Sequence, residues 1–188
     1  FYRSMGDKHP KSKESLLLQV LNRKSHRFTE QEIYQFPCGN SGYDMHFDIK
    51  SNSLLFAFQD YCAPKGKELM YAAIDINSLG SITPKPIFSS DTWEKRHPYF
   101  FTYQELTYLV HTTGDYWGLM SGHSGKTSIG ISVIDSLGSP SNYNVIVDSV
   151  QLDENLAIFN DSIYYRVRDT NTYSAMTIKK IALNDVFK

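Results

Sequence analysis

Residues 66–81 read GKELMYAAIDINSLGS, and residues 125–139 read GKTSIGISVIDSLGS. The two stretches share an opening Gly-Lys pair and a closing Ser-Leu-Gly-Ser, with a single-residue gap between them. Self-similarity of this kind is the sequence signature of a repeat protein. The chain therefore contains at least two copies of one structural unit.

The similarity extends on both sides of these two stretches. Upstream, NSLLFAF at 52–58 matches QELTYLV at 104–110, and downstream PIFS at 86–89 matches NVIVD at 144–148. The apolar segments have the alternation and the aromatic or β-branched content of strands, and Gly, Pro, Asn, Asp and Ser separate them. Each unit is therefore predicted to be a four-stranded antiparallel meander.

A four-stranded meander that recurs along a chain fits the blade of a β-propeller. We expect an all-β fold, a β-propeller or propeller fragment of four-stranded antiparallel blades, forming a single domain over residues 1–188. Its parts are a partial blade at 14–40, complete blades at 43–91 and 97–149, and a partial blade at 150–188. Residues 1–13 are expected to form a loop or a frayed lead-in. Roughly three to four blades are fewer than most closed propellers contain, so the chain is expected to be part of a larger propeller, and a compact four-bladed ring is the less favoured alternative.

Charge and hydropathy exclude two classes of partner. Lys and Arg number 19 against 20 Asp and Glu, which gives a formal charge of -1 and no basic field for a phosphate backbone. Nucleic acid is therefore not an expected partner. No apolar run approaches the roughly 18 residues that span a bilayer, so no membrane span is expected.

The two cysteines, Cys38 and Cys62, both lie in turn-like contexts. They are either bridged in an oxidising compartment or two separate thiols, and the sequence leaves both alternatives open. Neither has the neighbouring histidines of a structural zinc site. We expect no metal and no cofactor.

The sequence PIFSSD at 86–91, followed by RHPYF at 96–100 and LTYLV at 106–110, resembles the blade motif of TolB-like, WD-like β-propellers. In that family an outer strand leads into a loop, and a His-Pro or Ser-Pro opens the next inner strand. The resemblance covers about residues 40–150, although residues 103–105 stand where the family has a Ser-Pro-Asp-Gly turn. It implies a scaffold for protein or ligand contact that is secreted, periplasmic or at the cell surface, and it supplies no catalytic residues.

The sequence GHSGKT at 122–127 looks like a phosphate-binding loop. Such a loop needs a glycine where Met120 stands, and it must lead into a helix, whereas residues 128–134 read as a strand. Gly66-Lys67 occupies the same place in the preceding unit. Lys126 is therefore predicted to be a solvated hairpin residue without phosphate chemistry.

The densest group of aromatic and cationic side chains falls on the third unit. Residues of these types dominate binding hot spots. The loop before the first strand of this unit and the loop between its second and third strands share one face only if the strand count above is right. The candidate ligand-binding residues are Trp93, Arg96, His97, His111, Tyr116, Trp117 and His123.

These residues favour a non-catalytic module that binds a protein or carbohydrate through loops on one face. One alternative is a propeller glycoside hydrolase or sialidase-like enzyme, with Asp44, Asp48 and either Asp153 or Glu154 as acids on first strands. His97 stands where the third unit would supply such an acid, which weighs against this alternative. The other alternative is a viral or cell-surface attachment domain.

Overall fold

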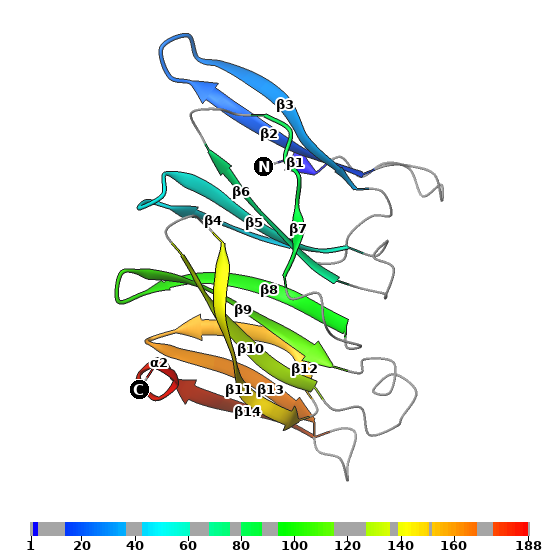
Figure 1. The fold of residues 1–188 in the computed structure, drawn as a ribbon, viewed down its shortest axis with the longest axis vertical. Coiled ribbons are helices and arrows are strands. Elements are labelled where there is room, and N and C mark those ends of the chain that lie inside the picture. The colour runs from blue at the N-terminus through cyan, green and yellow to red at the C-terminus, as the bar shows by residue number, and fades with distance from the viewer. Residues whose placement is uncertain are drawn as a thin grey trace.

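The computed structural model describes residues 2–3, 14–36, 43–60, 68–75, 80–87, 94–114, 127–135, 139–150, 152–168 and 175–187. Within these ranges the chain folds almost entirely into β-strands (Figure 1), which confirms the all-β class. The N-terminal strands are β1 (Tyr2–Arg3), β2 (Glu14–Asn22), β3 (Arg27–Phe36), β4 (Tyr43–Asp48), β5 (Ser53–Asp60), β6 (Glu68–Asp75) and β7 (Lys85–Pro86). The C-terminal elements are β8 (Glu94–Tyr103), β9 (Leu106–Gly114), β10 (Thr127–Ile134), β11 (Pro140–Val150), β12 (Leu152–Phe159), β13 (Ser162–Arg168), β14 (Met176–Ala182) and the short helix α2 (Leu183–Val186). No helix in the described ranges is long and apolar enough to cross a membrane.

The described strands form four antiparallel sheets, and in each sheet strands that follow one another in the chain are neighbours. Sheets β4–β7 and β8–β11 have four strands, and sheets β1–β3 and β12–β14 have three. The four-stranded meander predicted for the two repeated units is therefore present in both.

The sheets stack face to face along the long axis of the molecule, with β1–β3 at one end and β12–β14 at the other (Figure 1). Three clusters of buried side chains fill the spaces between successive sheets. Leu55 and Ala57 of β5 pack toward β8–β11, whereas Phe56 and Phe58 pack toward β1–β3. Because both faces of β5 are covered, its sequence is continuously apolar instead of alternating.

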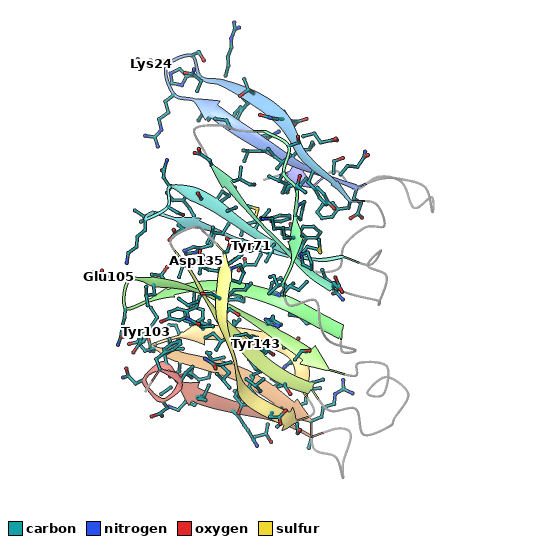
Figure 2. All side chains as sticks on the ribbon, viewed as in Figure 1. Lys24, Tyr71, Tyr103, Glu105, Asp135 and Tyr143 are labelled. Atoms are coloured by element: carbon teal, nitrogen blue, oxygen red, sulfur yellow. The ribbon has the colours of Figure 1, made fainter. Side chains whose placement is uncertain are left out.

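Tight turns close one edge of the stack. They join β2 to β3, β4 to β5, β8 to β9 and β12 to β13, and the side chains of Lys24 and Glu105 mark this edge in Figure 2. Strands β5, β9 and β13 run from these turns to the opposite edge, where the pairs Asp60–Glu68, Gly114–Thr127 and Arg168–Met176 lie. The four tight turns therefore lie at one edge of the molecule, and these three pairs of strand ends lie at the other.

Two boundaries differ from the sequence prediction. Tyr2–Arg3 pairs with Leu16 and Leu17, although residues 1–13 were expected to form a loop. Strand β8 begins at Glu94, whereas the first strand of this blade was expected to start at residue 97, after a loop. A register shift between Arg96 and Tyr99, with a positive φ of 52° at His97, lets β8 continue through the His-Pro pair.

Candidate functional site

The register of sheet β8–β11 brings the ends of the two predicted recognition segments together. Gly114 pairs with Glu94 on one side and with Thr127 on the other. Trp93 directly precedes Glu94, and residues 115–126 connect Gly114 to Thr127. Both segments therefore start at the same edge of the same sheet. This is the condition under which the two loops share one face.

Most of the predicted binding residues lie outside the described residues. These are Trp93, Tyr116, Trp117 and His123, together with the side chain of Arg96. Lys67, Lys126, Cys38 and Cys62 also lie outside them, as do the side chains of Asp153 and Glu154. His97 is described, and it is half-buried at the irregular point of β8.

His111 is placed differently from the prediction. Its side chain is 0% exposed, and its ring stacks on the ring of Tyr143 of β11, with 5.6 Å between centroids. His111 pairs with Gly130, where a Cβ would lie 2.2 Å from Cε2 of Tyr143. The missing side chain of Gly130 thus lets Tyr143 lie over this part of the sheet. His111 is part of the packed interior, not of an exposed recognition surface.

A row of polar contacts joins β4 to the neighbouring sheet, and we call the three residues Asp44, His46 and Asp48 the β4 seam. They alternate along β4 and so share one face of the strand. The backbone N–H of Phe100 donates to Oδ2 of Asp44 at 2.5 Å. His46 Nε2 lies 3.2 Å from Oγ1 of Thr102.

Asp48 completes the seam near the tight-turn edge. Oγ1 of Thr107 donates to Oδ1 of Asp48 at 3.0 Å. The N–H and hydroxyl of Ser51 both donate to Oδ2, at 2.9 and 2.5 Å. The carboxylate therefore fixes its own turn and also binds a strand of the next sheet.

The two carboxyl groups of the seam have pKa values shifted in opposite directions. Burial raises the pKa of Asp44, and hydrogen bonds from the N–H groups of Phe100 and Met45 and the charge of His46 offset only part of that effect. Burial alone would also raise the pKa of Asp48, but its hydrogen bonds from Ser51 and Thr107 outweigh burial and hold it below its ordinary value.

A cavity of about 420 Å³ lies beside β6, and the sequence did not predict it. Its lining comes from residues 71–75, residues 80–83, Lys85 and Ser139. Burial raises the pKa of Tyr71, and the negative charges of Asp135 and Asp48 raise it further. Ser139 donates its N–H to Oδ1 of Asp135 at 2.9 Å, which links the residue after β10 to the residue before β11. Tyr71 lies on β6, and Asp135 directly follows β10 of the neighbouring sheet (Figure 2).

The described residues contain no group of three or more His, Cys, Asp or Glu side chains placed to hold a metal ion. Comparison with known proteins gave no match to any family model, to any curated protein or to any solved structure. The site must therefore be interpreted from its own geometry.

Proposed function

We propose that the chain is a non-catalytic β-propeller module that recognises a protein or carbohydrate through the loops at one edge of its sheets. Strand β4 lies against β8, and β8 lies against β12. The first strands of successive sheets are therefore adjacent, as the innermost strands of neighbouring propeller blades are. In this proposal each sheet is a blade, and the protein acts outside the cytoplasm, as the TolB-like resemblance implies.

The observation that carries the binding proposal is the shared edge of Glu94, Gly114 and Thr127. At the opposite edge, the turns from β2 to β3, β4 to β5, β8 to β9 and β12 to β13 have only two to four residues, although residues 76–84 and 135–139 leave that edge as well. The segments that start at the shared edge include Trp93, Tyr116 and Trp117. Aromatic side chains with a polar atom supply large contact area to sugars and peptides.

The test uses Trp117→Ala. A glycan array and a displayed peptide library are screened with the wild-type chain, and the strongest binder is titrated by calorimetry. Loss of a hot-spot aromatic removes about 2 kcal/mol of binding free energy, or roughly thirtyfold in affinity. We expect that loss with an unchanged thermal midpoint, because Trp117 is assigned to the ligand and not to the core.

Phe47→Ala is the matched control, since Phe47 is an exposed aromatic at the tight-turn edge. It should leave the affinity unchanged. Unfolding of the Trp117→Ala variant, or an affinity equal to that of the wild type, would contradict the proposal.

A glycoside hydrolase is the second candidate, and the β4 seam favours it. A general acid and an ionised partner need carboxyl groups whose pKa values are pushed apart, as those of Asp44 and Asp48 are. Both carboxylates are, however, occupied by hydrogen bonds to the adjoining sheet or turn. Hydrolysis of aryl glycosides by the purified chain would favour the enzyme over the binding module.

A further inference from the structure

The outer strand of sheet β4–β7 covers only part of its neighbour. The partners of β7 are Met70 and Tyr71 of β6. In sheet β8–β11, by contrast, β11 pairs with β10 as far as Ile134, the last residue of β10. Strands β6 and β10 are the third strands of the two repeated units. Within the described residues, the outer edge of residues 72–75 therefore lacks the neighbouring strand that β10 has.

The chain between β6 and β7 is held by a different sheet. The N–H of Ile82 donates to the carbonyl of Ile33 in β3 at 3.0 Å, and the side chain of Ile82 packs against the core between β1–β3 and β4–β7. Ile87 belongs to the core on the other side of sheet β4–β7. The segment that carries β7 therefore crosses the edge of its own sheet instead of following β6 (Figure 1).

Backbone groups of β6 point toward the space that this crossing leaves. The carbonyl of Leu69 accepts from the N–H of Ile87, on the outer side of β6, at 2.8 Å. Alternate residues of an antiparallel strand direct their N–H and C=O to the same side, so those of Ala73 also point to the outer side. Among the described residues, Ala73 has no strand partner on that side. An edge of this kind is a template for another extended chain.

The cavity of about 420 Å³ borders this edge. Strand β6 supplies one part of its lining, residues 80–83 supply another, and Lys85 and Ser139 supply the rest. Its volume falls within the range of about 300–1,000 Å³ in which ligand sites occur. The cavity therefore offers room and backbone hydrogen-bonding groups for an extended peptide.

The burial pattern of β6 indicates which side chains such a peptide needs. Ala72 and Ile74 are buried, whereas Ala73 and Asp75 are exposed. Directly opposite residues of an antiparallel pair point to the same face. An added strand therefore places apolar side chains beside Ala72 and Ile74 and polar side chains beside Ala73 and Asp75.

We propose that an extended peptide segment of a partner protein binds along residues 72–75 of β6 as an added strand, antiparallel to β6 as β11 is to β10. In strand addition, main-chain hydrogen bonds supply affinity, and contacts of alternate side chains supply specificity. The peptide alternates apolar and polar residues. Its site lies at the tight-turn end of β6, away from the edge of Glu94, Gly114 and Thr127, so it does not depend on the binding function proposed above.

Capped hexapeptides that alternate Val or Ile with Thr or Lys are the probes, and fluorescence anisotropy measures their binding to the full chain. The tightest one is then N-methylated at alternate residues, in either of two phases. One phase removes the N–H groups that face β6 and should weaken binding about fivefold for each hydrogen bond lost. The other phase removes N–H groups that face away and should leave the affinity unchanged. Equal affinities of the two methylated peptides, or no binding by any peptide at millimolar concentration, overturn the proposal.

Ser81→Trp should abolish peptide binding, because Ser81 lines the cavity and is exposed. Ser25→Trp, in the exposed turn after β2, is the matched control and should bind like the wild type. If circular dichroism shows that Ser81→Trp does not fold, Ala73→Pro replaces it. Proline is tolerated at an unpaired strand edge, and it removes the N–H that the peptide needs. Unchanged affinity in the folded variant overturns the proposal.

Hydrogen exchange followed by NMR locates the bound peptide. Saturation with the peptide should slow exchange of the Ala73 N–H and leave the residues of β10 unchanged. Trp117→Ala should bind the peptide like the wild type, which separates this site from the loops. Protection elsewhere without protection of Ala73, or loss of binding in Trp117→Ala, overturns the proposal. A wild-type dimer in light scattering that Ser81→Trp abolishes would make a second copy of this chain the occupant instead.

Discussion

Asp44 and Asp48 lie four residues apart on one face of β4, yet they contribute to stability with opposite dependence on pH. Asp44 is half-buried, and the hydrogen bonds from the N–H groups of Phe100 and Met45 offset only part of the effect of burial, so its charged form is disfavoured. Asp48 accepts three hydrogen bonds from Ser51 and Thr107, so its charged form is favoured. The hydrogen bonds that each carboxylate accepts, not the residue type, therefore decide whether its pKa is lowered or raised.

Asp48→Asn should destabilise the fold at neutral pH. The pKa of Asp48 is lower when folded than its unfolded value of 3.8, so its carboxylate stabilises the fold above that pH. The substitution should lower the free energy of unfolding at neutral pH by about 1 kcal/mol, the usual net value of a hydrogen bond. The difference from wild type should disappear as the pH falls below 3.8 and on through the folded pKa. Urea unfolding at a series of pH values measures it.

Asp44→Asn should show the reverse trend in the same measurement. The pKa of Asp44 is above 3.8 when folded, so its charge opposes folding at neutral pH and that penalty is relieved as the pH falls toward 3.8. Wild type should therefore gain stability relative to this variant on acidification. Thr107→Val, which removes one donor to Asp48, should reproduce part of the Asp48→Asn effect. Parallel pH profiles for the two Asn variants would show that the seam does not control the pH dependence.

The tight turns reverse the direction of the chain in two different ways. The turns after β2 and β4 have four residues, and each ends in a residue with positive φ, His26 at 52° and Asn52 at 50°. Side-chain oxygens of Asn22 and Asp48 accept backbone N–H groups within these turns. The turns after β8 and β12 have two residues, and both residues have positive φ. Those values fit the type I′ hairpin turn, whose twist matches that of the strands.

Replacing Gln104-Glu105 by Asn-Gly should stabilise the protein. Gln104 and Glu105 have φ of 45° and 62°, a conformation that Asn and Gly adopt with far less strain. The gain should be about 1 kcal/mol in the free energy of unfolding. The ion pair of Glu105 with Lys50 is lost, but it is exposed and contributes little. Chemical denaturation measures the gain.

The turn after β12 provides the matched comparison. It already has Asn160 at its first position, with φ of 44°, followed by Asp161 with φ of 52°. Changing only Asp161 to Gly should therefore give a smaller gain. The prediction is wrong if both turns gain equally in the free energy of unfolding, or if the variant at residues 104–105 loses stability. Either result would show that the residues with positive φ do not strain these turns.

The sequence predicted the strands better than the contacts between sheets. The Gly-Lys and Ser-Leu-Gly-Ser repeats fixed the two meanders because turn chemistry is local. The bond from Phe100 to Asp44 joins residues 56 positions apart, and no local pattern encodes it. The burial of His111 was missed for the same reason, since it depends on Tyr143 from β11. A glycine inside the strand, Gly130, was the available signal of close approach by another group.

The four sheets follow one another in a stack with two ends, and the position of a sheet decides how much of it is covered. Sheets β4–β7 and β8–β11 bury side chains on both faces, whereas β1–β3 and β12–β14 bury them on one. In repeat proteins, stability is close to a sum of the units and of the contacts between neighbours. Each end sheet packs against one neighbouring sheet, and each middle sheet packs against two.

Amide hydrogen exchange should therefore be slowest in the middle sheets and fastest at the ends of the stack. Opening an end sheet breaks one core cluster, whereas opening β5 or β9 breaks two, and local opening free energy follows the buried contacts that are lost. Mass spectrometry of peptides from the dilute protein measures this difference in exchange. We expect β5 and β9 to be protected longest and β3 and β14 least. Equal exchange in all four sheets would mean that the stack opens as one cooperative body instead of from its ends.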